Sequence, residues 1–501
     1  MIAKLKAEIS SHIFIYLLLF LVVLGAIFVR VYRVDQILWF YFDQGRDALV
    51  IWDFWHKGDL FFVGPTTGIA GIFRGPWYYW LIAPIYLVGG GDPVWPAIFL
   101  SLLSVVAVIF LFILGKEIAG RSAGLIAAII ASFSYYIMIA SRWLSNPTPM
   151  LLISLLIIFS SFRIIDSKKP TKYWLLILFL LGMAMQFGSA AEIFYFPIVA
   201  LIAVWRRKTL SKRLLFVSFC LLFVSFLPQI IFDVRHQGIL SANIRKFLVD
   251  EGSFKLSFWE IIKIRLPFYW DIFANKIWPG EPNFIKSAIV MGFLVFVANW
   301  REILKNNKFK ITLLFWISPM IGMLFFQGNY GNVYDYYFTG FYLIFILFFS
   351  TIYSFLTRSG FGLILLVTFF FFFFKINLPL IKNFITAGVD GPTTVAFGNQ
   401  KQAVDWIYKD LPAGRQVPFS VDVYVPPVIP YAYDYLFVWY GPKIAGYEPS
   451  KDVINPLYTI YEVDPPHPER LEAWLKRQEG IGVVDREEKF GGIVVQKRER
   501  I

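Results

Sequence analysis

Apolar stretches without charged residues occupy most of this 501-residue chain, and they restrict its fold more than any other feature. A helix needs about 20 such residues to cross a bilayer, because the hydrocarbon core is about 30 Å thick and each residue adds about 1.5 Å. Hydrophobic residues reach 58% and charged residues only 16%, which excludes an ordinary soluble enzyme and a disordered chain. About eleven stretches have a suitable length, near residues 12–29, 94–115, 122–140, 149–165, 173–187, 189–205, 214–232, 283–299, 311–326, 338–356 and 360–376. The predicted fold is an α-helical integral membrane protein with about eleven transmembrane helices.

The loops between these stretches divide by charge. Lysine and arginine gather in alternate loops, such as residues 206–213, whereas the short turns on the other side, near 141–148, 188–192 and 327–337, contain one basic residue, Arg142. Because basic loops stay in the cytoplasm, we predict a multi-pass cell-membrane protein with a cytoplasmic N-terminus. The formal charge of +13 then reflects topology, and no nucleic-acid partner is expected.

Three long segments fall on the outer side, namely residues 33–93, residues 233–282 and everything after about 377. The last segment has proline-rich turns, and its patterns predict helices at 400–411 and 468–478 and strands at 419–425, 457–463 and 492–497. We therefore predict a membrane domain over residues 1–377, with its first outer loop at 33–93, and a small extracytoplasmic α/β domain over residues 378–501. The single cysteine, Cys220, excludes a disulfide framework and a cysteine-based metal cluster.

The first outer loop places acidic residues directly after an aromatic patch. Asp43 and Asp47 follow Leu38-Trp39-Phe40-Tyr41-Phe42, with Gln44 and Arg46 between them. Aromatic rings settle at the membrane surface, and residues four apart share a face of a helix. Two carboxylates are therefore predicted at the membrane surface, where they can serve chemistry. The alternative is that Asp43 only caps a helix lying on the bilayer.

A single arginine stands further along this loop, in Arg74-Gly75-Pro76-Trp77-Tyr78-Tyr79-Trp80. A guanidinium fork pairs bidentately with phosphate, and low local polarity strengthens the contact. Arg74 is therefore a candidate ligand for an anion at the interface. The alternative is an anchor that binds ordinary lipid head groups.

The remaining outer turns contain further polar candidates. Arg142 opposes the basic-inside trend, and either a phosphate or an outer-loop carboxylate would explain it. His236 is expected to be structural, since the four histidines show no metal-ligand spacing. The turn Asn329–Tyr337, which includes Tyr336, offers rings that stack on sugars or form an aromatic belt. Glu192 is a weaker candidate for binding an acceptor or a cation.

These motifs, taken in order, resemble the GT-C superfamily of polyprenyl-phosphate-sugar-dependent glycosyltransferases, especially protein O-mannosyltransferases, lipid A aminoarabinose transferases and Rgt-type enzymes. Asp43-Gln44 is similar to the acidic pair that begins the first outer loop of these families, with Gln44 in place of glutamate. Arg74–Trp80 resembles their basic-Pro-Pro-Leu-x-x-Trp stretch. Ser141–Asn146 is similar to their Ser-Arg-x-x-x-x-Asp turn, with Asn146 in place of aspartate. Gln186-Phe187-Gly188 ends a span where lipid A transferases show Lys-Gly.

The resemblance implies a GT-C fold and a sugar transfer at the outer face. Asp43 would be the base for an acceptor hydroxyl on a glycan, lipid or protein, and the reaction would invert the anomeric carbon. Arg74 and Arg142 would stabilise the departing phosphate. The other predicted substrate-binding residues are Arg46, Asp47, Asn146, Gln186 and Tyr336. No cofactor or metal is required on this reading, and membrane lipids and a polyprenyl-phosphate sugar are the expected partners.

Three other functions remain open from the sequence. A metal-dependent oligosaccharide transferase would use Asp43 and Asp47 together. A lipid-linked glycan flippase or exporter would usually place ionisable groups in mid-membrane, where the predicted span centres contain none. A non-catalytic assembly subunit would serve mainly to present the C-terminal domain.

Overall fold

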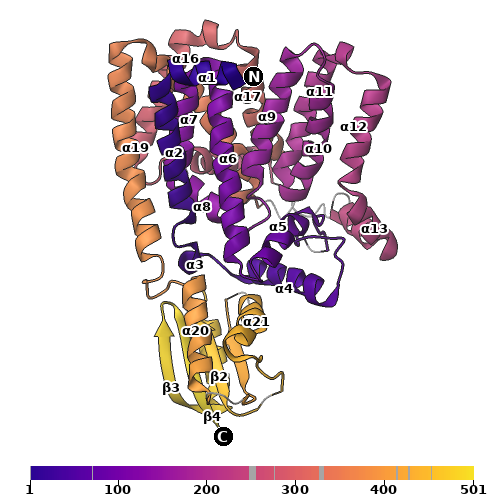
Figure 1. The fold of residues 1–501 in the computed structure, drawn as a ribbon, viewed down its shortest axis with the longest axis vertical. Coiled ribbons are helices and arrows are strands. Elements are labelled where there is room, and N and C mark those ends of the chain that lie inside the picture. The colour runs from indigo at the N-terminus through magenta and orange to yellow at the C-terminus, as the bar shows by residue number, and fades with distance from the viewer. Residues whose placement is uncertain are drawn as a thin grey trace.

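The computed structural model describes residues 2–69, 71–247, 256–275, 277–326, 332–412, 416–426, 429–452 and 454–501. A helical bundle forms one half of the molecule, and a smaller domain with a sheet lies beyond one end of the bundle (Figure 1). Two helices of the first outer loop, α4 and α5, lie between these halves (Figure 1).

The first helices are α1 (Ile2–Ser11), α2 (Ile13–Val31), α3 (Val34–Ile37), α4 (Phe42–Lys57), α5 (Trp77–Val88), α6 (Val94–Ala119), α7 (Arg121–Phe133), α8 (Tyr135–Arg142), α9 (Met150–Asp166) and α10 (Thr171–Phe187). They are followed by η1 (Ala190–Phe194), α11 (Tyr195–Trp205), η2 (Arg207–Thr209), α12 (Lys212–Val224), α13 (Leu227–Arg235), α14 (Ile239–Arg245), α15 (Phe258–Trp270) and η4 (Asp271–Asn275). The bundle ends with α16 (Pro282–Ile303), α17 (Asn307–Met323), η6 (Asp335–Phe338), α18 (Thr339–Tyr353), η7 (Ser354–Arg358) and α19 (Gly360–Ala387).

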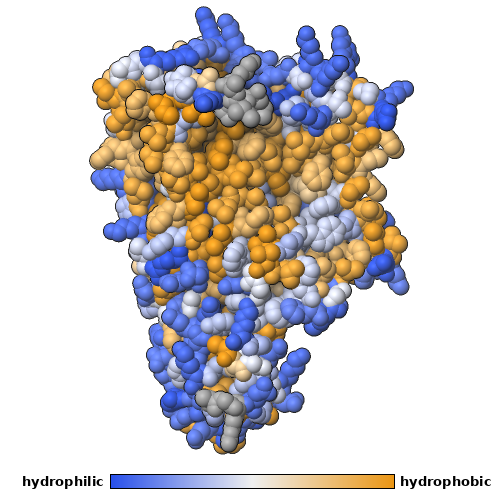
Figure 2. Space-filling model, viewed as in Figure 1, coloured by the Kyte–Doolittle hydropathy of each residue, from blue (hydrophilic) through white to orange (hydrophobic). Residues whose placement is uncertain are grey.

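Each predicted apolar stretch coincides with a helix or with two consecutive helices. Among the described residues, five helical segments are long and apolar enough to cross a membrane, and the number rises to seven if two bent pairs each form one span. The bent pairs are α7 with α8, at 67°, and α12 with α13, at 54°. On the face shown in Figure 2, hydrophobic residues form a belt across the bundle, with hydrophilic residues above and below it. The molecule is therefore a multi-span membrane protein, as the sequence predicts.

The segment 233–282, predicted to lie outside, does not stand clear of the bundle over its second half. Trp278 is fully buried, with its ring 4.7 Å from that of Phe349 in α18 and 5.9 Å from that of Phe369 in α19. Phe273 likewise packs on Trp316 of α17. The sequence did not indicate this packing, because a short apolar segment between polar turns gives no continuous hydrophobic run. The placement of residues 233–282 on the outer side stays a prediction.

The C-terminal domain contains α20 (Phe397–Asp410), α21 (Tyr431–Trp439), α22 (Gly441–Ala445), α23 (Pro468–Glu479) and the strands β1 (Ser420–Tyr424), β2 (Leu457–Glu462), β3 (Gly482–Phe490) and β4 (Ile493–Arg500). The strand order is β1-β2-β4-β3, with β1 parallel to β2 and the other pairs antiparallel. The helices α21 and α22 make the crossover that a parallel pair requires. The predicted helices and strands are confirmed, but α21, α22 and β3 were missed, and α19 extends past residue 377 to Ala387.

The C-terminal domain is fixed to the first outer loop by backbone contacts. The amide of Phe397 donates to the Leu38 carbonyl at 3.0 Å, and the Gln400 side chain donates to the Phe40 carbonyl at 2.9 Å. Helix α21 crosses α4 so closely at Gly45 that an added Cβ would lie 2.3 Å from the Ala432 nitrogen. Only glycine fits this crossing, since the opposing atoms belong to the backbone.

We expect Gly45→Ala to loosen the docking of the C-terminal domain, because the new methyl group must displace the α21 backbone. An overpacked contact typically costs about 1–3 kcal/mol, so thermal unfolding of the detergent-purified protein should shift to lower temperature. Gly360→Ala is the matched control, since a Cβ there meets nothing within 4 Å. Equal stability of the two variants would contradict the tight crossing.

Candidate functional site

The start of α4 holds Asp43 at the surface of the outer loop. The Tyr41 amide donates to Gln44 Oε1 at 3.2 Å, and Gln44 Nε2 donates to the Leu144 carbonyl at 3.1 Å. Gln44, which replaces the second acidic residue of the motif, thus connects the helix start to the turn after α8. Asp43 lies in the first turn with 60% of its side chain exposed, where the helix dipole favours a carboxylate.

Arg46 joins both carboxylates of this segment. Its Nη1 lies 2.8 Å from Asp43 Oδ1 and its Nη2 lies 2.7 Å from Asp47 Oδ1. Arg46 Nη1 also donates to Thr66 Oγ1 at 2.8 Å, and the Tyr79 hydroxyl donates to Asp47 Oδ1 at 2.8 Å. Burial raises the pKa of Asp47 to about 6, and the adjacent Arg46 opposes the rise. Asp47 is therefore a buried partner that holds Arg46, whereas Asp43 is open to a substrate.

A short hairpin carries Arg74 back toward these residues. The Gly64 amide donates to the Arg74 carbonyl at 2.7 Å, and Thr66 forms an antiparallel bridge with Phe73. The Arg74 guanidinium makes no hydrogen bond or ion pair with any residue that the structure describes. Burial lowers the pKa of Arg74, and charge interactions with Glu192, Tyr336 and Tyr337 oppose that change. The basic group is thus positioned by its backbone and left open at its charged end.

The glycine after Arg74 allows the end of α10 to approach the hairpin. A Cβ on Gly75 would lie 2.0 Å from Gln186 Oε1. Gln186 Nε2 donates to Gln229 Oε1 at 2.9 Å, and Gln229 in turn donates to the Phe73 carbonyl at 3.1 Å. The buried Gln186 Oε1 has no hydrogen-bond partner among the described groups. Gln186 therefore lies directly beside the Arg74 segment, with one acceptor unused.

The turn after α8 connects the other predicted residues. Asn146 Nδ2 donates to the Phe187 carbonyl at 2.9 Å, which fixes the turn to the end of α10. The ring of Trp143 packs on that of Tyr336 at 6.1 Å. The structure thus brings Arg74, Asn146, Gln186 and Tyr336 to one region. Residues 329–331 of the predicted Tyr336 turn lie outside the described residues.

Arg142 does not join this region. Its guanidinium donates to the carbonyls of Val29, at 3.0 Å, and Tyr32, at 3.1 Å, and it lies over the ring of Phe384. These contacts satisfy carbonyl groups at the C-terminal end of α2, so the Arg142 side chain stabilises the bundle. Among the described residues, the His236 ring bonds to the carbonyl one turn before it and to no other group, and no three potential metal ligands converge there.

Glu192 is more deeply buried than its place in a predicted turn suggested. Its side chain is 1% exposed, and its Oε2 accepts from the Ser189 amide at 2.5 Å and the Ser189 hydroxyl at 3.2 Å. The Glu192 carboxylate also attracts the Arg74 guanidinium electrostatically. The sequence also gave no sign that the Tyr79 hydroxyl donates to Asp47. The available signal for Glu192 was a lone acidic residue in an otherwise apolar outer turn.

Comparison with known proteins finds a similar family model and similar folds. Residues 74–232 match the family model described as dolichyl-phosphate-mannose-protein mannosyltransferase. The crystal structure of ArnT from Cupriavidus metallidurans in the apo state superposes with a TM-score of 0.61 at 10% identity, over 97% of this chain and 98% of that one. The chain has the GT-C fold.

A second ArnT structure, bound to undecaprenyl phosphate, superposes with a TM-score of 0.57 at 10% identity and covers 98% of both chains. Because the identity is low, this likeness concerns the fold. The family match begins at Arg74 itself and includes Asn146, Gln186 and Glu192. A search of curated proteins finds no match.

Proposed function

We propose that this protein is a GT-C glycosyltransferase that moves a sugar from a polyprenyl phosphate to an acceptor hydroxyl on the outer face of the membrane. The observation that carries the proposal is the Arg74 guanidinium. It has no hydrogen-bond partner among the described residues, and it belongs to the same loop as the exposed Asp43. The mannosyltransferase family match over residues 74–232 and the undecaprenyl phosphate bound to ArnT support this choice of donor.

Arg74 is the proposed ligand of the donor phosphate. A guanidinium removed from bulk water binds a phosphate strongly, because the surrounding protein screens the attraction poorly. Its hairpin holds the charge in place before the donor arrives. As the bond between the anomeric carbon and the phosphate oxygen breaks, negative charge grows on that oxygen, and a prepositioned cation stabilises it.

Asp43 is the proposed base. It takes the proton of the acceptor hydroxyl while the oxygen attacks the anomeric carbon from the side opposite to the phosphate, so the configuration inverts. Arg46 holds Asp43 Oδ1, which fixes the orientation of the carboxylate. Asp47 and Tyr79 fix Arg46 from its other side and so position the base.

The remaining predicted residues receive supporting roles. Gln186 offers its free amide oxygen to a sugar hydroxyl, and Tyr336 offers a ring on which a sugar can stack. Asn146 holds the turn that carries Trp143. Arg142 is assigned to α2 rather than to the phosphate. No metal is invoked, because Arg74 supplies the positive charge, and no nucleic acid is expected.

The acceptor is proposed to enter between the C-terminal domain and α4. A cavity of about 360 Å³ lies there and is lined by Tyr41 and Phe42, the residues directly before Asp43. The Glu462 carboxyl also lines it, and burial raises the pKa of Glu462 to about 7. Rings beside polar side chains suit a sugar or a lipid-linked glycan, and the domain faces the cell exterior in the proposed topology of about eleven spans.

The donor assay tests the function directly. Purified protein is incubated with radiolabelled polyprenyl-phosphate sugars, each with and without an ion gradient across proteoliposomes. We expect one donor to be consumed without a gradient. Movement of an intact lipid-linked glycan that needs the gradient would favour the flippase, and activity lost on chelation would favour the metal-dependent transferase.

Asp43→Asn should keep the shape of the side chain but remove the proton acceptor. Binding of undecaprenyl phosphate should survive, and single-turnover transfer should fall by about 10²-fold or more, the usual share of a general base. Asp53→Asn is the matched control, since Asp53 lies on the same helix and pairs only with Lys57. Wild-type turnover in Asp43→Asn would remove Asp43 from the reaction and leave Asp47 as the nearest carboxylate.

Arg74→Ala should weaken undecaprenyl phosphate binding by about 1.5–3 kcal/mol, the range for hydrogen bonds to charged groups. Arg74→Lys should restore only part of it, because a point charge replaces a two-pronged fork. Arg142→Ala is the control, and it should lower stability through the lost carbonyl contacts while donor affinity per folded molecule stays unchanged. If isothermal titration showed that Arg142→Ala weakens binding and that Arg74→Ala does not, the phosphate role would pass to Arg142.

A further inference from the structure

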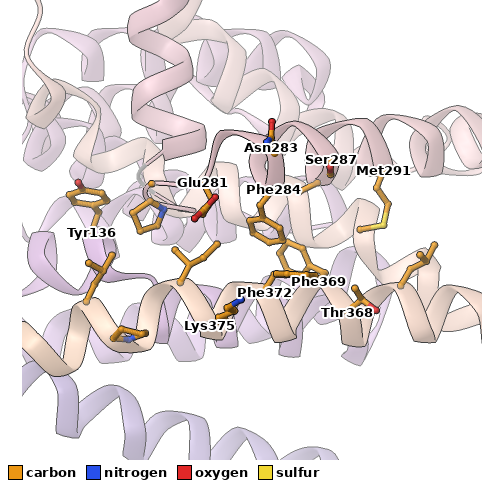
Figure 3. Close-up of a pocket in the computed structure, with 17 residues that line it drawn as sticks. Tyr136, Glu281, Asn283, Phe284, Ser287, Met291, Thr368, Phe369, Phe372 and Lys375 are labelled. Atoms are coloured by element: carbon orange, nitrogen blue, oxygen red, sulfur yellow. The ribbon is translucent and has the colours of Figure 1, made fainter.

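A long groove runs along the lipid-facing side of the bundle between α16 and α19. It has a volume of about 850 Å³, and Phe284, Met291, Phe369 and Phe372 provide much of its lining. The two helices run side by side in the close-up (Figure 3). Helix α19 lies on the side of the bundle away from α5 and α13 (Figure 1), and no residue of the Arg74 region lines the groove.

The groove has a rigid apolar floor. The ring of Phe284 stacks on Phe369 at 5.8 Å and lies 5.8 Å from Phe372, and the buried Trp278 supports Phe369 from behind. At the far ends of the helices, Arg358 and Glu302 form a two-pronged ion pair with distances of 2.6 and 2.7 Å. The helices are therefore held together at that end, while the groove between them stays open to lipid.

Two opposite charges face this apolar surface. Glu281 and Lys375 both line the groove and lie in the space between α16 and α19 (Figure 3). Both side chains are exposed, and neither forms a hydrogen bond or ion pair with the residues that the structure describes. Charged groups near hydrocarbon are costly and normally pair with a partner. A ligand that carries both a positive and a negative group would satisfy the two residues together.

We propose that this groove binds a phospholipid whose head group carries a primary ammonium and a phosphate, as in phosphatidylethanolamine. The phosphate contacts the Lys375 ammonium, the lipid ammonium contacts the Glu281 carboxylate, and one acyl chain lies on Phe284, Phe369 and Phe372. A purely anionic lipid would pair with Lys375 but would face the Glu281 carboxylate without a cation. A choline head group has no N–H to donate to that carboxylate.

Native mass spectrometry of the detergent-purified protein tests the proposal. The full chain is titrated with phosphatidylethanolamine, phosphatidylglycerol and phosphatidylcholine of identical acyl chains. We expect phosphatidylethanolamine to bind about tenfold more tightly than the other two, since one charged hydrogen bond corresponds to about that ratio. Equal retention of the three lipids by the wild-type protein would overturn the proposal, whatever the variants do.

Variants then assign the preference to the two charges. Glu281→Gln should bring the affinity for phosphatidylethanolamine down to that for phosphatidylglycerol, and Lys375→Gln should weaken binding of all three lipids. Lys382→Gln is the matched control, because Lys382 lies two turns further along α19 and does not line the groove. An unchanged preference in Glu281→Gln would refute the assignment. Displacement of the bound lipid by undecaprenyl phosphate at equal concentration would instead give the groove to the donor.

Discussion

The close crossing of α21 over α4 at Gly45 determines where the candidate site lies. Gly45 stands two residues after Asp43, so the same helical turn that contacts the C-terminal domain presents the proposed base. The pairing of Leu38 and Phe40 with α20 fixes the chain just before that turn. Asp47, one turn further along α4, is buried, accepts a hydrogen bond from Tyr79 and holds Arg46 directly. The first outer loop is therefore shaped jointly by the two domains, and neither alone would orient Asp43.

The arginines at the end of the bundle next to α4 differ in how far the protein satisfies them. Arg30 donates to Ser104 and to the carbonyls of Ala131 and Ser132, and Arg142 donates to two carbonyls of the α2 end. Arg46 is shared between two carboxylates. A guanidinium already bound to carbonyls or carboxylates has little to gain from a phosphate. Arg74 differs from these three because its described neighbours act on it only through charge.

The fold was predictable from the sequence where the physical signal is long and periodic. The apolar stretches located the helices, and alternation located β1, β2 and β4. The edge strand β3 escaped because its sequence, Gly-Val-Val-Asp-Arg-Glu-Glu-Lys-Phe, is exposed along most of its length and lacks an apolar face. The sharp bends at Ser134 and near Phe226 escaped because hydropathy reports length and not direction.

The candidate site was predictable in its composition but not in its connections. The motifs pointed to Asp43, Arg74, Asn146 and Gln186. In the structure, Asp43 begins α4, and the other three lie in segments that contact one another. The sequence did not reveal that Gln44 spans to Leu144 or that Arg142 turns into the bundle, because these contacts join residues about one hundred positions apart. Charge and residue type suggest which side chains bind a ligand, whereas only tertiary contacts tell which ones are already occupied.

The same distinction applies to the membrane-facing charges. Lys116 and Arg121 share Glu8, and Lys308 pairs with Glu117 and Asp166, so these three basic residues have protein partners. Lys375 and Glu281 lie in an apolar groove and pair with no described residue. Since an unpaired charge beside hydrocarbon is costly, a fold that keeps two of them in one groove leaves their neutralisation to the lipid. Arg74 follows the same logic with a single positive charge, which selects an anion instead of a zwitterion.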